Sequence, residues 1–231
     1  MFSLRSTEKE LLDQDEIPAA DLFQNLRELD FINHWLGGYS ISFAAFKSIL
    51  KKDKSYQLVD IGCGGGDTLK RIANWNKKAA FNLQLVGVDI KPVCIEYAKE
   101  NLRNTPVKLI CDDYRHIFQY QKQIDIIHAC LFCHHLSEEP LVQLVTFALE
   151  HKAILVINDL ERNPLAYYSI KWLTKLFSKS YLVKNDAPLS VLRGFKRKEW
   201  YAILELAGAT KYTIRNKWAF RHEVIVYGNT N

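Results

Sequence analysis

The sequence predicts an α/β protein with a mostly parallel seven-stranded sheet, helices on both faces and an antiparallel hairpin at its C-terminal end. Short apolar runs alternate with helical segments between positions 57 and 158, which is typical of a parallel sheet covered on both sides. A glycine-rich turn follows the first apolar run. The last two expected strands follow one another without a helix between them, so they should pair antiparallel.

The expected elements follow in order along the chain. Five parallel strands are predicted at residues 57–61, 83–89, 107–111, 124–129 and 153–158. The helices between them are predicted at residues 67–76, 93–101 and 141–149. A further helix and the two hairpin strands are predicted at residues 196–207, 211–215 and 223–227.

Residues 1–54 are expected to form an N-terminal helical cap on a domain that spans residues 55–231. Leucines at helical spacing predict a first helix, a glycine pair ends it, and a second helix follows; the two span residues 19–36 and 40–50. The polar residues up to Pro18 are expected to form a loosely attached arm.

The composition is ordinary for a globular protein. Of 231 residues, 48% are hydrophobic and 25% are charged. No signal peptide is expected, and no window approaches the roughly 18 uninterrupted apolar residues of a membrane span. Five cysteines, an odd number without disulfide spacing, fit a reducing compartment, so we expect a cytoplasmic protein.

A basic insertion at residues 161–195 separates the fifth expected strand from the last helix. Nine basic residues between Arg162 and Lys198 stand against one acid, Asp186, whereas the whole chain carries a net charge of +5. Residues 165–177 predict an amphipathic helix, which is typical of a lid over the core or a bound substrate. Contact with a membrane surface and docking of an acidic carrier protein are the alternatives. Nucleic acid is not expected, because no recognised binding motif accompanies the charge.

The glycine-rich turn predicts a ligand at the N-terminus of the helix that follows it. Glycines allow the sharp turn and a close approach of the ligand, and the helix N-terminus attracts an anionic group. A dinucleotide site prefers a third glycine where this chain has Asp67. The carboxylate of Asp67 would repel a pyrophosphate but could accept hydrogen bonds from an ammonium group. Together with Asp60 in the preceding strand, it favours a zwitterionic amino-acid ligand over NAD.

Acidic residues also follow the next two expected strands. Asp89 ends the second strand, where a carboxylate can accept hydrogen bonds from both ribose hydroxyls. Asp112 and Asp113 follow the third strand, where an acid can accept a hydrogen bond from an adenine amino group. Helix capping is the alternative for each single acid, but acids at three successive strand ends favour a nucleoside site.

Four motifs at these strand ends are Val59–Gly66, Val86–Ile90, Ile110–Asp113 and Ile124–Ala129. Together they resemble the motifs of the class I S-adenosylmethionine-dependent methyltransferases, over roughly residues 55 to 160. The resemblance implies a Rossmann-like methyltransferase fold with S-adenosyl-L-methionine as cofactor. Two further segments, residues 158–162 and 185–193, resemble small-molecule methyltransferases encoded near bacterial polyketide pathways.

The resemblance also implies roles for single residues. Asp60, Gly62 and Gly64 would contact the methionine part of the cofactor, and Ala129 would lie near the sulfonium. Asp89 and Ile90 would hold the ribose and the adenine. Asp113 departs from the usual small residue, so which of the two neighbouring aspartates faces adenine stays open. The expected cofactor-binding residues are Asp60, Gly62, Cys63, Gly64, Asp67, Asp89, Ile90, Asp112, Asp113 and Ala129.

A cysteine–histidine cluster, Cys130-Leu131-Phe132-Cys133-His134-His135, follows the fourth expected strand. It matches the C-x-x-C-H pattern for haem attachment, but that chemistry needs export, and ligands this close along a strand cannot all face one metal. No haem or metal is therefore expected. His134 and His135 would lie beside the transferred methyl group, where a histidine can accept a proton from an acceptor hydroxyl. Packing or helix capping by these histidines is the alternative.

These observations predict a methyltransferase that acts on a small-molecule acceptor, either free or presented by an acidic carrier. O-methylation of a phenolic or polyketide-derived compound is the favoured reaction. An NAD-dependent oxidoreductase and a non-enzymatic interaction protein with the same fold are the alternatives. A monomer and a homodimer are both compatible with the sequence.

Overall fold

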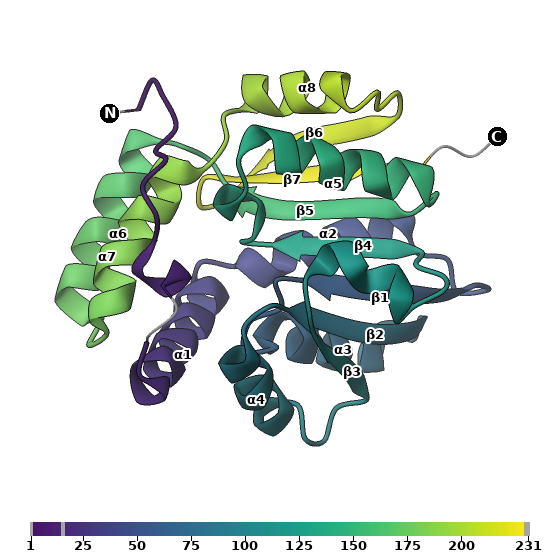
Figure 1. The fold of residues 1–231 in the computed structure, drawn as a ribbon, viewed down its shortest axis with the longest axis horizontal. Helices are drawn as coiled ribbons and strands as arrows, with labels where there is room; N and C mark the ends of the chain where they lie inside the picture. The colour runs from purple at the N-terminus through teal and green to yellow at the C-terminus, as the bar shows by residue number, and fades with distance from the viewer. Residues whose placement is uncertain (1, 15–16, 229–231) are drawn as a thin grey trace.

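A seven-stranded sheet forms the centre of the computed structural model, which describes residues 2–14 and 17–228 (Figure 1). The strands lie in the order β3-β2-β1-β4-β5-β7-β6. Their bounds are β1 (Ser55–Ile61), β2 (Asn82–Asp89), β3 (Val107–Cys111), β4 (Ile126–Cys130), β5 (Ile154–Leu160), β6 (Tyr212–Lys217) and β7 (Arg221–Val226). Strands β1 to β5 are parallel, and β7 runs antiparallel between β5 and β6. This topology confirms the predicted fold class.

The C-terminal hairpin has a tighter turn than the sequence predicts. Lys217 pairs with Arg221, so only three residues connect the strands. Two of them, Ala219 and Phe220, have φ angles of 57° and 53°. Left-handed backbone is unusual for residues with a side chain, and neither residue announces a turn.

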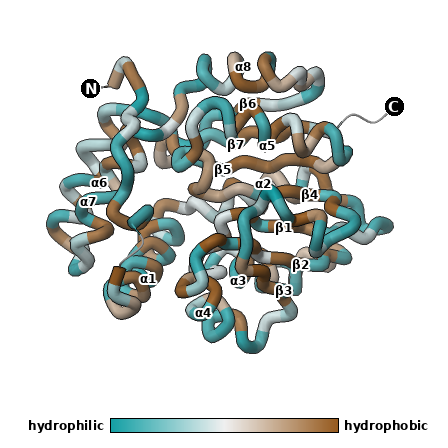
Figure 2. The backbone as a smooth tube through the Cα atoms, in the orientation of Figure 1, coloured by the Kyte–Doolittle hydropathy of each residue, from teal (hydrophilic) through white to brown (hydrophobic). Residues whose placement is uncertain are grey.

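Helices cover both faces of the sheet. α5 (Glu138–Glu150) and α8 (Arg197–Leu206) pack on one face, where Trp200 is fully buried. α2 (Gly38–Ile49), α3 (Asp67–Ala79) and α4 (Pro92–Asn101) pack on the other, where Phe46 is fully buried. The central strands are hydrophobic along most of their length, as burial on both faces requires (Figure 2).

Three further helices lie beyond the carboxyl ends of the parallel strands (Figure 1). These are α1 (Ala19–Trp35), α6 (Pro164–Phe177) and α7 (Tyr181–Arg193). The basic insertion therefore contains two helices where the sequence predicts one. α7 escapes sequence analysis because Pro188 lies inside it and its buried residues include Asp186 and Arg193, which blur the apolar pattern.

The N-terminal segment is firmly attached, so the expectation of a loose arm is wrong. Residues 2–14 run beside α7 toward α1 and include the short helix η1 (Leu11–Asp13) (Figure 1). The carboxylate of Asp186 accepts hydrogen bonds from the backbone amides of Leu11 and Leu12 at 2.8 and 2.9 Å. Arg5 donates to the carbonyl oxygens of Arg193 and His134. Polar partners from the insertion satisfy this segment, and no local pattern in the sequence announces them.

Part of the charge in the insertion is structural. Arg162 and Arg193 are 1% and 7% exposed. Arg162 pairs with Glu199 at 2.5 Å and Arg193 with Asp13 at 3.0 Å. By contrast, α6 leaves apolar side chains exposed on its outer side, including those of Tyr168, Trp172, Leu176 and Phe177. No helix in the described part of the chain is long and apolar enough to span a membrane.

Candidate active site

A cavity of about 880 Å³ opens at the carboxyl edge of the sheet, between the strand ends and the outer helices α1, α6 and α7. This edge is where parallel α/β sheets bind ligands. The structure brings ten of the twelve expected site residues to its wall: Gly62, Cys63, Gly64, Asp67, Asp89, Ile90, Asp112, Asp113, His134 and His135. Asp60 and Ala129 do not line it.

The glycine-rich turn owes its shape to close packing. Gly62 has a φ of +62°, and a β-carbon there would lie 2.2 Å from the ring of Phe132. The turn also lies against β2, since the backbone amide of Cys63 donates to the carbonyl of Val88 at 3.0 Å. Gly66, with a φ of 76°, is the N-cap of α3. The first turn of α3 therefore faces the cavity, as the sequence predicts.

Asp89 joins the end of β2 to the glycine-rich turn. Its carboxylate accepts hydrogen bonds from the backbone amides of Gly64 at 2.8 Å and Lys91 at 2.9 Å. Burial raises the pKa of Asp89, and the two amides oppose that rise. The next residue, Ile90, is 65% exposed although it lines the cavity. The Lys91 ammonium donates to the carbonyl of Leu12 at 2.6 Å and so holds the N-terminal segment beside Asp89.

Asp112 and Asp113 follow β3 and are both engaged with local partners. The Tyr120 hydroxyl donates to Asp112 at 2.7 Å, and this bond contributes most to lowering the pKa of Asp112 to about 2. Asp113 accepts from the backbone amide of Arg115 at 2.9 Å and pairs with its guanidinium at 2.6 Å. Asp113 therefore caps the short helix η2 (Tyr114–Gln119), as the capping alternative proposes. Both carboxylates remain on the cavity wall.

Asp60 lies beneath the cavity in a buried polar chain. It is 2% exposed, and an oxygen of its carboxylate lies 2.7 Å from Nδ1 of His128 on β4. Nε2 of His128 lies 2.9 Å from the Ser42 hydroxyl on α2. Asp60 thus links β1 to β4 and α2, and it does not line the cavity.

Asp67 carries the acidic charge at the glycine-rich turn. It accepts a hydrogen bond from Asn101 at 2.8 Å. Burial and the neighbouring carboxylate of Asp30 raise the pKa of Asp67 to about 6. Asp30 is a site residue that sequence analysis missed; its carboxylate lies 3.3 Å from Arg71 and accepts from the Tyr39 hydroxyl at 2.7 Å.

Three other polar side chains on the cavity wall were also missed. Asn25 and Asn33 on α1 are buried, and both have side-chain atoms without a hydrogen-bond partner among the described residues. Arg221, at the start of β7, is 3% exposed; its Nε has no partner within residues 2–14 and 17–228, and its Nη1 lies 3.4 Å from Asn158. Burial lowers the pKa of Arg221. Unsatisfied buried polar groups are costly, so a polar ligand is expected beside them.

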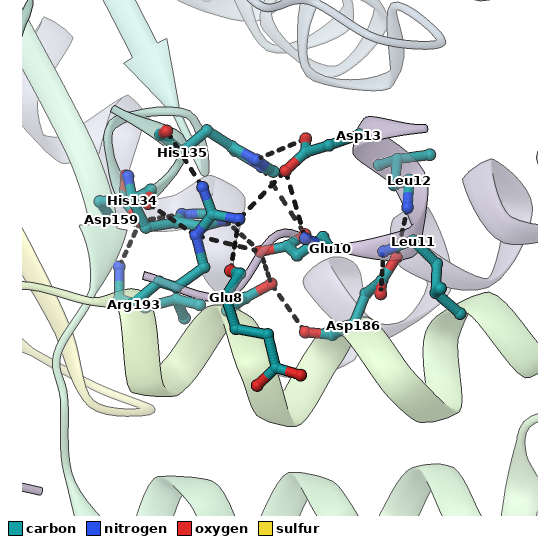
Figure 3. A network of polar contacts seen from close by, with 12 residues as sticks. Glu8, Glu10, Leu11, Leu12, Asp13, His134, His135, Asp159, Asp186 and Arg193 are labelled. Atoms are coloured by element: carbon teal, nitrogen blue, oxygen red, sulfur yellow. Dashed lines mark hydrogen bonds and ion pairs between the residues drawn. The ribbon is translucent and has the colours of Figure 1, made fainter. Parts of the chain in front are cut away.

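The two expected catalytic histidines lie together in a network of carboxylates (Figure 3). Asp159 at the end of β5 lies 2.7 Å from Nδ1 of His134. Asp13 lies 3.1 Å from Nδ1 of His135. Glu10, which is 3% exposed, lies beside both rings, and its carboxylate accepts a hydrogen bond from Ser190 at 2.8 Å. Burial raises the pKa of Glu10. Burial acts in the same direction on Asp159, but the contact with His134 outweighs it and the pKa of Asp159 is lowered.

The strand order reverses between β1 and β4, and the cavity lies at this point beside the glycine-rich turn. Its wall carries acidic and buried polar side chains. These features are typical of the nucleotide-binding site of a Rossmann-like enzyme. Residues 58–151 match the family model described as a methyltransferase domain. This match and the fold support an S-adenosylmethionine-dependent methyltransferase domain in this part of the chain, with S-adenosyl-L-methionine as the cofactor.

Solved structures of methyltransferases share the fold at low sequence identity. The plantazolicin methyltransferase BpumL, in complex with S-adenosylhomocysteine, is 19% identical, with a TM-score of 0.66 over 94% of this chain and 91% of that chain. A proposed O-methyltransferase from Nostoc punctiforme is 17% identical, with a TM-score of 0.63 over 96% of this chain and 64% of that chain. The CurJ carbon methyltransferase is 16% identical, with a TM-score of 0.56 over 79% of this chain and 51% of that chain. No curated protein matches the sequence.

Proposed function

We propose that this chain is an S-adenosylmethionine-dependent methyltransferase that acts on a hydroxyl group of a small-molecule acceptor, and that His134 accepts the proton of that hydroxyl. The observation that carries the proposal is the Asp159–His134 pair, of which His134 lines the cavity and Asp159 lies behind it. Asp159 engages Nδ1 of the imidazole, which leaves Nε2 as the atom that can accept a proton. A carboxylate behind the ring stabilises the imidazolium that forms.

The polar groups at the other end of the cavity suit the cofactor. Asp67, with Asp30 behind it, offers negative charge for the ammonium group of the methionine part. Arg221 offers a buried positive charge for the carboxylate of the same part. Asp89 and Ile90 would hold the ribose and the adenine. S-adenosyl-L-methionine supplies the electrophilic methyl group.

The acceptor end of the cavity is largely apolar, because α6, α7 and the β6–β7 turn wall it. Its lining includes Leu160, Ile170, Leu173, Val191 and Phe220. Such a wall favours an aromatic or polyketide-derived acceptor over a sugar or a nucleotide. Exposed lysines on α6 leave docking of an acidic carrier as part of the proposal, although Arg162 and Arg193 are already paired internally. All five cysteines are free thiols, which favours a cytoplasmic location.

The test is a turnover assay with a panel of phenols, amines and carbon nucleophiles, with the methylated atom located by NMR. We expect transfer to phenolic oxygen. His134→Ala should lower kcat by about 10²- to 10⁴-fold and leave the affinity for S-adenosylhomocysteine unchanged. Methylation of nitrogen or carbon alone, or full activity of His134→Ala, would overturn the proposal.

A further inference from the structure

Three side chains with metal-ligating atoms converge on one point of the cavity wall. Glu10, His134 and His135 each offer one such atom, and these atoms lie within 4.8 Å of one another. Glu10 comes from the N-terminal segment and the histidines from the short helix η3 (Cys133–His135) after β4. Glu10 and His134 are 3% exposed and His135 is 23% exposed, so this is a built site rather than a chance surface cluster.

The spacing of these atoms fits a shared ion better than direct hydrogen bonds. Nε2 of His134 and Nε2 of His135 lie 3.7 and 3.9 Å from the Glu10 carboxylate oxygens, which is too long for a hydrogen bond. Within the described residues, neither Nε2 has a hydrogen-bond partner. Two ligand atoms about 2.1 Å from a tetrahedral ion lie about 3.4 Å apart. The Glu10–histidine separations would have to close by a few tenths of an ångström, and the widest separation, which is at most 4.8 Å, by up to about 1.4 Å. Rotation of the partly exposed His135 side chain could supply the larger movement.

Each of the three side chains is already oriented by a second polar group. Asp159 engages Nδ1 of His134, and Asp13 engages Nδ1 of His135. The Ser190 hydroxyl donates to the carboxylate of Glu10. A carboxylate on the far nitrogen of a histidine and a hydrogen bond to a ligating carboxylate are the usual outer partners of a metal site.

The charge around the three ligands also suits a dication. Four carboxylates take part in the network, those of Glu10, Asp13, Asp159 and Asp186 (Figure 3). Two guanidinium groups oppose them, since Arg193 pairs with Asp13 and Arg5 donates to the carbonyl of His134. With neutral imidazoles, two negative charges are left for a bound ion to balance. Burial of uncompensated charge is costly, and a dication removes that cost.

We propose that Glu10, His134 and His135 bind a divalent transition-metal cation of the Zn²⁺ type. Two imidazole nitrogens and one carboxylate oxygen are donors that such cations prefer over Mg²⁺. Three protein ligands leave a coordination position open, as in catalytic rather than structural sites. The binding site does not depend on the proposed function. A cation bound to Nε2 of His134 would occupy the atom that accepts the hydroxyl proton in the proposed function, so His134 would act as the base only in the metal-free protein.

Residues 130–135, whose spacing is wrong for a metal, supply only two of the three ligands of this site. The cysteines of that segment are not among the three converging ligands. The third ligand is Glu10, which lies near the N-terminus and is distant from the histidines in sequence. No sequence spacing rule connects it to them.

The test is direct titration of the full chain, after dialysis against a chelator, with Zn²⁺ by calorimetry and with Co²⁺ by visible absorption. We expect one equivalent to bind, with Mg²⁺ failing to compete. Glu10→Gln and His135→Ala should each weaken binding by about 100-fold or more, and Asp13→Asn by about 10- to 100-fold. His151→Ala, which removes an exposed histidine stacked on Phe118, is the matched control and should bind like the parent.

The outcomes separate this proposal from the proposed function. A folded protein that binds S-adenosylhomocysteine but neither Zn²⁺ nor Co²⁺ overturns the metal site and leaves O-methylation standing. Binding that survives in Glu10→Gln and His135→Ala but is lost in Cys111→Ser also overturns it, because Cys111 is an exposed thiol elsewhere. Binding lost in the ligand variants supports the site even where no acceptor oxygen is methylated.

Discussion

At the scale of single residues, the acids of the sequence motifs divide into two roles that their spacing does not separate. Asp67, Asp89, Asp112 and Asp113 line the cavity, whereas Asp60 is directed at His128 beneath it. A strand alternates its side chains between two faces, so one residue of register decides which role an acid takes. The motif therefore predicts where the turn lies, and only packing determines what Asp60 touches.

Replacement of Asp60 should act on stability. In Asp60→Ala, Nδ1 of the fully buried His128 loses its partner, which costs about 1–3 kcal/mol of unfolding free energy. Urea denaturation measures this loss. Asp53→Ala, in an exposed turn, is the control and should change little. A variant of unchanged stability but much weaker binding of S-adenosylhomocysteine would instead place Asp60 against the ligand.

Asp67 should make cofactor binding depend on pH. Its pKa is raised from 3.8 to about 6, first by burial and then by Asp30. The folded state thus binds the proton more tightly than the unfolded chain does. As the pH rises from about 4 to 6, the contribution of Asp67 to the unfolding free energy therefore falls, and above about pH 6 it stays constant. An ammonium group needs the ionised form, so the affinity for S-adenosylhomocysteine should rise from about pH 5 to 7.

Asp67→Asn supplies the matching variant. It should abolish that rise, and it should stabilise the ligand-free protein above pH 6 by on the order of 1 kcal/mol. Calorimetry at several pH values and urea denaturation test both effects. A parent protein whose affinity does not change between pH 5 and 7 would remove Asp67 from the ammonium site.

At the scale of elements, the regular strands and helices were predictable and the segments around the acceptor were not. Period and length predict β1 to β5 and the helices between them, because each element buries an apolar stripe of its own. The N-terminal segment and α7 instead bury polar side chains in pairs. Asp186 holds Leu11 and Leu12, and Ser190 holds Glu10. Such long-range pairs leave no periodic trace in the sequence.

These long-range pairs give a structural role to two segments that lie outside the motifs of the fold, residues 158–162 and 185–193. Residues 158–162 supply Asp159 to His134, and residues 185–193 supply Asp186 and Ser190 to the N-terminal segment. Both stretches therefore contact the N-terminal segment and the histidines, which lie at the end of the cavity where we propose that the acceptor binds. The cofactor end depends on other residues.

Lys91 should decide how firmly the N-terminal segment is held. Its ammonium donates to the carbonyls of Leu12 and Gln14 at 2.6 and 2.8 Å. Lys91→Met removes both hydrogen bonds, which should lower the free energy of local opening of this segment by about 1 kcal/mol. Where a protease cleaves the locally opened form, residues 5–14 should then be cleaved about fivefold faster. Limited proteolysis measures the rate. Lys99→Met, on the exposed side of α4, is the control; equal rates in the two variants would contradict the assignment.

At the scale of the whole molecule, the cavity lies between two layers, of which only one could be predicted in detail from the sequence. The sheet and its covering helices form one layer, and residues 2–14 with α1, α6 and α7 form the other (Figure 1). Pattern and motif predicted the first layer and with it the cofactor. The contacts of the second layer join distant parts of the chain and leave no such pattern, so the acceptor could be predicted from the sequence only as a class.

A ligand that bridges the two layers should stabilise the whole protein. S-adenosylhomocysteine at 100 times its Kd adds about 2.7 kcal/mol to the unfolding free energy, which corresponds to a rise in Tm of roughly 5–10 °C for a chain of this size. Because α1 and residues 2–14 line the cavity and α8 does not, amide hydrogen exchange should slow more in the former than in α8. NADH should shift neither quantity, since Asp67 repels a pyrophosphate. A Tm that rises with NADH and not with S-adenosylhomocysteine would show that the zwitterionic site has been assigned to the wrong ligand.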